Sequence, residues 1–235
     1  MKILDHTIRF PHPETAHPSG ILAIGGDLST ERLLLAYQYG IFPWYNEGEP
    51  IVWWHPDPRF VLFPTEVKIA KSMRSYFNKA KYRVTFDQEF DTVIYKCGTA
   101  KDRKHEGTWI SEEIVSSYSY LHEIGYAHSV EVWDGGTLVG GLYGIAIGKV
   151  FYGESMYSDA PNASKMALIT LARVLQQQGF VLIDCQISNP HLESMGGRHI
   201  PRSMFMEYMS KNAVLPPDHG IWDSDAFDID IKTIL

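Results

Sequence analysis

The chain has 235 residues, 45% of them hydrophobic and 13% aromatic, and its 21 basic and 28 acidic side chains give a formal net charge of −7. This composition predicts a globular protein of one large domain, or of a large and a small one, and it excludes a helical membrane protein because no apolar run is long enough to span a bilayer. Two cysteines, Cys97 and Cys185, make no disulfide framework, and residues 1–6 do not open a secretory signal, so we expect a cytoplasmic protein.

Residues 1–57 are rich in proline and glycine turns. A single helix is predicted among them, from Thr30 to Tyr39, with Ser29 as N-cap and Gly40 as its stop. The exit of this helix carries several aromatic residues, including Trp44. We expect residues 1–57 to form a small, loop-rich domain that contributes aromatic side chains to a cleft.

A cluster of basic residues follows in the next stretch. The apolar spacing of residues 66–78 predicts a helix, and no acidic residue occurs between Lys68 and Arg83. The basic residues there are Lys68, Lys71, Arg74, Lys79, Lys81 and Arg83. On an acidic protein such a stripe is either a phosphate-binding face or a solvated helix surface, and the stripe alone does not decide between them. A strand over residues 82–86, a helix over 89–97, a charged loop over 98–107 and a helix through His122 come next.

The second half of the chain predicts a β-meander followed by a buried helix. Strands are expected over residues 126–133, 137–147 and 150–157, a helix that is apolar nearly all round over 162–178, and a strand over 180–189. A last helix is expected over 201–211. The order βββαβ indicates an α+β fold with a GNAT-like (acyl-CoA N-acyltransferase) core, in a catalytic domain of residues 58–235. Because the turn over residues 158–164 has no glycine, a coenzyme A donor is not expected.

Two of these strands carry acidic and polar side chains within apolar runs. Asp184 and Gln186 should share one face of the last strand, opposite Ile183 and Cys185, if it alternates regularly. Such a pair is either a satisfied polar pair at a sheet edge or part of a site, because buried polar groups need hydrogen-bond partners. The strand over 150–157 also carries a carboxylate, Glu154, followed by Ser155. Two neighbouring strands of this kind favour a site.

A series of short motifs runs in order along residues 20–210. They are Gly25-Gly26-Asp27-Leu28, Gly40-Ile41-Phe42-Pro43-Trp44, Trp53-Trp54, Pro56-Asp57-Pro58-Arg59, Gly107-Thr108-Trp109-Ile110, His128-Ser129-Val130-Glu131-Val132-Trp133, Gly140-Gly141-Leu142-Tyr143-Gly144, Gly153-Glu154-Ser155-Met156, Asn162-Ala163-Ser164-Lys165, and Leu182-Ile183-Asp184-Cys185-Gln186 with Asn189. In these motifs the chain resembles the leucyl/phenylalanyl-tRNA–protein transferase family. The resemblance implies transfer of Leu, Phe or Met from aminoacyl-tRNA to the N-terminal Arg or Lys of a protein, which marks that protein for N-end-rule degradation. An activated ester needs no cofactor or metal, and no membrane partner is implied.

The resemblance also implies roles for individual residues. Asp184, Gln186 and Asn189 would be catalytic, with Asp184 the base that orients the acceptor amine and Glu154 in the same pocket, meeting the acceptor's cationic side chain. A donor pocket would be lined by Leu142, Phe151, Met156, Leu175 and Ile183, beside Ser155. Strict alternation puts Phe151 and Met156 on opposite faces, so a β-bulge is predicted near Gly153 and Glu154. The terminal adenosine would stack on Tyr37, Trp44 and Trp109, and the basic stripe would hold tRNA phosphates.

Two other functions fit parts of the same pattern. A coenzyme A-dependent N-acyltransferase shares the fold but lacks a pyrophosphate loop here. A non-catalytic tRNA-binding module would need only the stripe and the aromatic residues, and it leaves Asp184, Gln186 and Glu154 without a purpose.

Overall fold

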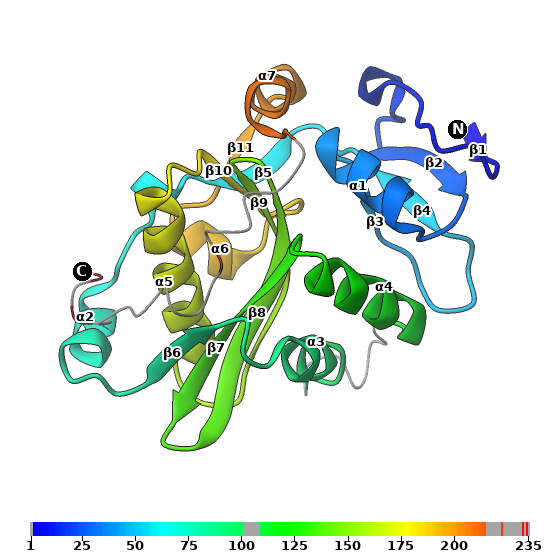
Figure 1. Cartoon of the computed structure of the whole chain (residues 1–235). Coiled ribbons are helices and arrows are strands. Elements are labelled where there is room, and N and C mark those ends of the chain that lie inside the picture. Colours follow the sequence, from blue (N-terminus) through cyan, green and yellow to red (C-terminus); the bar gives the residue numbers. More distant parts are fainter. Residues whose placement is uncertain (1, 101–108, 215–221, 223–231, 233, 235) are drawn as a thin grey trace.

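The computed structural model describes residues 2–100, 109–214, 222, 232 and 234. It is an α+β protein with a four-stranded sheet near the N-terminus and a seven-stranded sheet that forms the body of the molecule, as Figure 1 shows. The α+β class expected from the sequence is confirmed. Most of the charged loop expected over residues 98–107, and nearly all of residues 216–235, which carry several aspartates, lie outside the described residues.

The smaller sheet has the strand order β1-β2-β4-β3. Its strands are β1 (Lys2–Leu4), β2 (Ile21–Gly25), β3 (Phe42–Pro43) and β4 (Val52–Trp54), and helix α1 (Thr30–Gln38) lies between β2 and β3. The helix is followed by Gly40 at φ +70°, where a Cβ atom would lie 2.3 Å from the Phe205 ring. Glycine is required there for both the backbone conformation and the space.

The larger sheet has the strand order β11-β5-β10-β9-β8-β7-β6. Its strands are β5 (Arg59–Leu62), β6 (Arg83–Phe86), β7 (Ala127–Asp134), β8 (Thr137–Ile147), β9 (Val150–Ser158), β10 (Leu182–Asp184) and β11 (Arg198–Ile200). Strands β7, β8 and β9 are antiparallel neighbours, and β10 pairs with β9 in parallel. The chain therefore has the predicted order of three antiparallel strands, a helix and a further strand.

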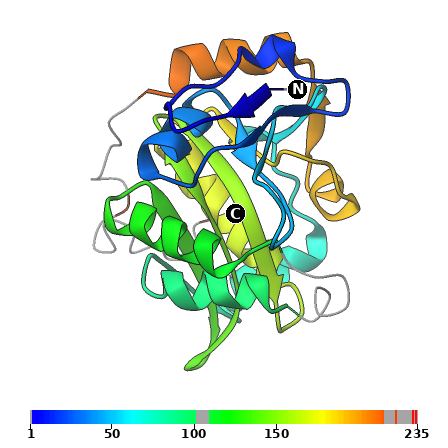
Figure 2. The same cartoon turned by 90° about the vertical axis from the view of Figure 1, so that its right-hand side faces the viewer.

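Helices cover both faces of the larger sheet (Figures 1 and 2). They are α2 (Lys71–Asn78), α3 (Phe90–Gly98), α4 (Glu112–Glu123), α5 (Ala163–Gln177), α6 (Pro190–Ser194) and α7 (Arg202–Asn212). One apolar cluster joins α5 and α2 to the sheet, and another joins α3, α4, α7 and the smaller sheet to its opposite face. The smaller sheet thus shares a core with the larger one. Its Trp53 is fully buried and donates to the Gly25 carbonyl at 2.8 Å.

Two local expectations differ from the structure, and several short elements were not expected at all. The strand expected over 180–189 ends at Asp184, because Gln186 adopts φ +55° and breaks the alternation. The helix expected over 66–78 begins only at Lys71, after a 3₁₀ turn over Pro64–Glu66. The four strands of the smaller sheet and the short elements β5, α6 and β11 were not predicted; α6 begins with Pro190, a residue that in the sequence reads as a stop.

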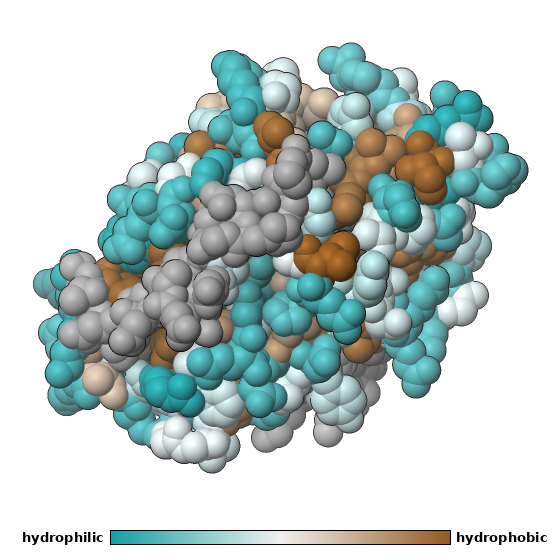
Figure 3. Space-filling model, viewed as in Figure 1, coloured by the Kyte–Doolittle hydropathy of each residue, from teal (hydrophilic) through white to brown (hydrophobic). Residues whose placement is uncertain are grey.

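The face drawn in Figure 3 is mostly hydrophilic, with apolar side chains in small separate patches. Among the described residues, the helices are all too short or too polar to cross a membrane.

Candidate active site

The site lies where strands β9 and β10 part. They pair only from Leu182 to Asp184, and β9 then bends away through an irregularity in its pairing with β8. Tyr143 pairs with Ser155 while Gly144 pairs with Gly153, so Glu154 is the extra residue of a β-bulge. The bulge predicted near Gly153 and Glu154 is confirmed, and it allows Phe151 and Met156 to face the same cavity.

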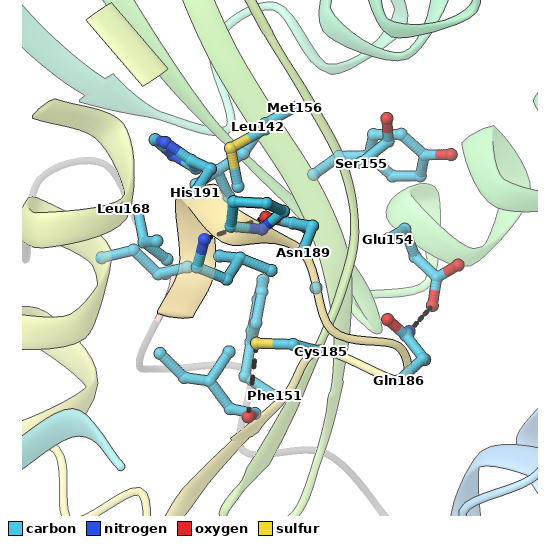
Figure 4. Close-up of a pocket in the computed structure, with 16 residues that line it drawn as sticks. Leu142, Phe151, Glu154, Ser155, Met156, Leu168, Cys185, Gln186, Asn189 and His191 are labelled. Carbon is cyan, nitrogen blue, oxygen red and sulfur yellow. Dashed lines mark hydrogen bonds between the residues drawn. The ribbon is translucent and has the colours of Figure 1, made fainter. Parts of the chain in front are cut away.

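An apolar cavity of about 460 Å³ lies on the α5 side of this opening. Figure 4 shows Leu142, Phe151, Met156 and Leu168 on one side of β9, with Glu154 and Ser155 on the other. The apolar residues that line the cavity are Leu142, Phe151, Met156, Leu168, Leu171, Ile183 and Leu192. Four of the five predicted donor-pocket residues are among them. Leu175 is not, because it lies one turn further along α5 in the core, and Leu168 and Leu171 line the wall instead.

A second hollow of about 460 Å³ lies between the smaller sheet and the loop after β10. Its aromatic wall comes from Phe42, Trp44 and Trp109, and the Trp44 side chain is 42% exposed. Tyr37 does not line this hollow. Its ring is fully buried, which does not support the expectation that it stacks on a base, and its hydroxyl bonds to Glu154.

The two hollows meet at a small polar group. Glu154, Gln186 and Asn189 line both of them, together with Cys185. Glu154 Oε1 accepts hydrogen bonds from the Tyr37 hydroxyl at 2.8 Å and from Gln186 Nε2 at 3.2 Å. Glu154 is partly buried between the two hollows, and desolvation of its carboxyl raises the pKa to about 8, against the effect of the Tyr37 hydrogen bond. A carboxyl with such a pKa can exchange a proton near neutral pH.

Asp184 lies behind this group and does not line either hollow. It is fully buried, and its carboxylate accepts from Arg59 Nε at 2.8 Å and from Arg59 Nη2 at 2.5 Å. It also accepts from the Gln186 backbone N–H at 3.0 Å. Both oxygens are therefore occupied by a bidentate ion pair, and this geometry does not support the expectation that Asp184 is the base.

Asp184 instead holds the residues that do reach the cavity. Its bond to the Gln186 N–H supports the left-handed backbone at that residue, which directs the Gln186 amide toward Glu154 (Figure 4). Asn189 is fixed differently: its Oδ1 caps α6 by accepting from Leu192 N at 2.9 Å. The Asn189 Nδ2 group is then the part of that amide left to donate to a bound substrate.

Two further side chains border the site. The Ser155 hydroxyl is buried and has no hydrogen-bond partner among the described residues. Burial raises the pKa of the Cys185 thiol, which therefore stays protonated. In the part of the chain that the structure describes, no three His, Cys, Asp or Glu side chains are grouped so as to hold a metal ion.

The six residues of the basic stripe are exposed on and around α2. Lys81 forms an ion pair with Asp134 at 2.7 Å, and the Arg83 guanidinium lies 5.1 Å from the Trp133 ring centre. Lys79 and Lys81 also line a shallow hollow of about 350 Å³. The stripe is open to solvent, and its proposed contact with phosphates stays a prediction.

Sequence reasoning missed Arg59, Leu168 and Leu171 as parts of the site. The signal for Arg59 was present, since an arginine closes the motif Pro56-Asp57-Pro58-Arg59. The leucines lie on the predicted buried helix at a spacing of three, which marks one face but not the part of that face that borders a cavity.

An apolar cavity and an aromatic hollow thus lie on either side of a carboxyl that can exchange a proton near neutral pH, an arrangement suited to an enzyme that transfers a group. The comparisons with known proteins name the family. The family model described as "Leucyl/phenylalanyl-tRNA protein transferase" matches residues 61–210, and that of its N-terminal domain matches residues 26–57. The chain belongs to the leucyl/phenylalanyl-tRNA protein transferase family, and the family resemblance and enzyme class expected from the sequence are confirmed.

Curated proteins with this name align with the chain over nearly their whole length. A leucyl/phenylalanyl-tRNA–protein transferase of Pseudomonas fluorescens (strain Pf0-1) is 51% identical over 92% of this chain and 96% of its own. One of Nitrosomonas eutropha is 52% identical over 92% of this chain and 93% of its own. Among solved structures, that titled as L-PGS from Bacillus licheniformis is similar with a TM-score of 0.40 and 13% identity, over 72% of this chain and 54% of that one.

Proposed function

We propose that the two hollows bind the two parts of an aminoacyl-tRNA end, with the ester between them beside Glu154. The apolar cavity would hold a Leu, Phe or Met side chain, and the aromatic hollow would hold the terminal adenosine by stacking on Trp44 and Trp109. The observation that carries this proposal is that both hollows share Glu154, Gln186 and Asn189. An ester bridging them would lie beside groups able to bind an amine and a developing oxyanion.

The acceptor in this proposal is the N-terminal Arg or Lys of a protein. Its α-ammonium has a pKa of about 7.7–8.0, close to the value of about 8 for Glu154, so the carboxylate can take one ammonium proton with little free-energy cost. The neutral nitrogen attacks the ester carbonyl carbon, the bond from that carbon to the ribose oxygen breaks, and the second nitrogen proton leaves with this oxygen. The products are an amide and a free tRNA hydroxyl.

Glu154 therefore takes the role that the sequence had assigned to Asp184. Because Oε1 already accepts two hydrogen bonds, we assign the free oxygen of Glu154 to the α-ammonium and propose no contact between Glu154 and the acceptor's cationic side chain. Gln186 orients the carboxyl, and Asn189 Nδ2 donates to the oxyanion of the tetrahedral intermediate.

The proposal also includes the domain organisation, the donor, the role of the basic stripe and the compartment. We assign strands β7, β8, β9 and β10 with α5 to a GNAT-like core in a domain of residues 58–235, preceded by the domain of residues 1–57. Coenzyme A is not the proposed donor, because the turn before α5 has no glycine and Asn162 occupies its left-handed position. The basic stripe would bind acceptor-stem phosphates, and the cytoplasm, where charged tRNA occurs, is the proposed compartment.

The test mixes the protein with Phe-tRNA and a peptide that begins with Lys, and weighs the peptide. The expected mass gain of the peptide is one Phe residue. It should be absent when the Phe-tRNA is digested with ribonuclease before the reaction, and absent with a matched peptide that begins with Glu. A mass gain of the peptide that occurs only with acetyl-CoA would indicate the N-acyltransferase alternative. Binding of tRNA without any gain would indicate a non-catalytic module.

A further inference from the structure

Two buried tyrosine hydroxyls form a row of hydrogen bonds that ends at Glu154, on the side of this residue away from the apolar cavity. Tyr37, in the last turn of α1, bonds to Glu154 Oε1 at 2.8 Å. Tyr118, in the middle of α4, bonds hydroxyl to hydroxyl with Tyr37. Both rings are fully buried and meet edge to face at 88°. Neither of them lines the two hollows.

A hydroxyl has one proton, so it can donate only one hydrogen bond, and this fixes which tyrosine donates to which. If Tyr37 gives its proton to Glu154, its own oxygen can only accept from Tyr118. The donation by Tyr118 therefore fixes the direction of the Tyr37 hydroxyl, and it polarises that hydroxyl into a stronger donor. Glu154 Oε1 then receives two donors, Tyr37 and Gln186.

The other carboxyl oxygen, Oε2, makes no hydrogen bond to any side chain or backbone group that the structure describes. With Oε1 occupied, proton exchange with a substrate in the hollows falls to Oε2. We propose that Tyr118 is a positioning residue for aminoacyl transfer, which acts through Tyr37 to keep Oε1 an acceptor and Oε2 the site of proton uptake. This rests on the proposed role of Glu154 as the proton acceptor.

Other groups also act on the Glu154 carboxyl and must be held constant in a test. Burial raises its pKa most, the Tyr37 hydrogen bond lowers it, the charge of Asp184 raises it and that of Arg59 lowers it. The titratable and charged groups around it, by element, are Tyr37 on α1, Tyr118 on α4, Tyr152 on β9, Arg59 on β5, Asp184 on β10 and Cys185 after β10. Removing the Tyr118 hydroxyl alters none of these charges, so its effect reports the hydrogen-bond chain alone.

The test measures two quantities in full-length protein. The first is the kcat for transfer from Phe-tRNA to a Lys-initiated peptide, both saturating, from pH 6 to 9.5. The second is the midpoint of Glu154, from the carbon shift of ¹³C-labelled glutamate, assigned by its loss in Glu154→Gln. The matched control is Tyr157→Phe, which removes a buried tyrosine hydroxyl that has no hydrogen-bond partner among the described residues and lies outside the site.

Tyr118→Phe is expected to raise both midpoints by about 0.5 to 1 pH unit, because a lost donor weakens the bond that favours the carboxylate. Below the midpoint, kcat then falls about 3- to 10-fold, while the KM for tRNA is unchanged. Tyr37→Phe, which removes the direct donor, should shift the midpoints further in the same direction. Tyr157→Phe should leave them in place.

A second variant guards against misfolding. Replacing Tyr118 alone with 3-fluorotyrosine keeps the ring and the hydroxyl but makes the phenol a stronger donor, so the midpoints should move down. Unchanged midpoints in both Tyr118 variants would overturn the positioning role even if kcat falls, since packing alone would then explain the loss. An unshifted pH profile in Glu154→Gln would instead remove the role of Glu154 itself.

Discussion

The ion pair between Arg59 and Asp184 allows a sharp test of what Asp184 does. Asp184→Ala leaves a fully buried guanidinium without the carboxylate that accepts two of its N–H groups, at 2.8 and 2.5 Å. Breaking a buried pair from one side costs about 3–5 kcal/mol. We expect a loss of this size in the free energy of unfolding, measured by urea denaturation with tryptophan fluorescence.

The double variant Arg59→Met with Asp184→Leu should recover much of that loss, because an apolar pair of similar volume needs no desolvation of charge. A residual cost of about 1–3 kcal/mol is expected, since the Gly40 carbonyl and the Gln186 N–H lose their buried partners. The two single variants and the double one form a cycle whose coupling energy isolates the ion pair.

Activity separates the two roles of Asp184. As an anchor, it is replaceable in part by Asn, which keeps an acceptor for the Gln186 N–H, so Asp184→Asn should retain measurable transfer. Its pH midpoint should move down, because the charge of Asp184 raises the pKa of Glu154. A base cannot be replaced in this way. A loss of stability below about 1 kcal/mol in Asp184→Ala, or a pH dependence abolished in Asp184→Asn, would refute the anchoring role.

Three further predictions concern the rest of the site. Because the pKa of Glu154 is raised to about 8, its contribution to stability is complete below about pH 4.5 and is lost as the pH rises through 8. The free energy of unfolding, measured by urea denaturation, should therefore decline by a few kcal/mol over this range, and Glu154→Gln should abolish the decline. Alanine at both Lys71 and Arg74 should weaken tRNA binding and reduce the slope of log Kd against log salt by about one for each phosphate that is no longer neutralised, whereas Lys211→Ala, an exposed control, should leave the slope unchanged. Trp44→Ala should raise the KM for Phe-tRNA about 5- to 150-fold because the base no longer stacks on the indole, and an unchanged KM would exclude Trp44 from the nucleotide site.

Elements with several periods of regular pattern were predictable from the sequence. The meander of β7, β8 and β9 and the apolar helix α5 follow directly from alternation and helical spacing. The bulge at Glu154 was also predictable, because alternation conflicted with the need for Phe151 and Met156 to share a wall. A β-bulge resolves that conflict, and Gly153 beside Glu154 indicates where it occurs.

Residues placed by tertiary packing were not predictable. The alternation of the last strand fails at Gln186, whose left-handed backbone is held by the Asp184 carboxylate, and no local signal marks a non-glycine residue for that conformation. The resemblance implied an exposed Tyr37 ring that stacks on a base, whereas the structure buries this ring and bonds its hydroxyl to Glu154. A motif identifies which residues gather, but which ring remains exposed depends on how α1 and α4 pack.

The two hollows are lined by different parts of the fold. The apolar cavity is lined by residues between Leu142 and Leu192, from the larger sheet, α5, α6 and the loop after β10. The aromatic hollow exists only where the smaller sheet meets the loop after β10. Arg59 joins the two parts, because its guanidinium pairs with Asp184, donates to the Gly40 carbonyl and lies between the rings of Phe42 and Phe205. In the proposed function, selection of the donor side chain therefore depends on the larger sheet and its helices, whereas alignment of the donor with the carboxyl depends on the contact between both sheets.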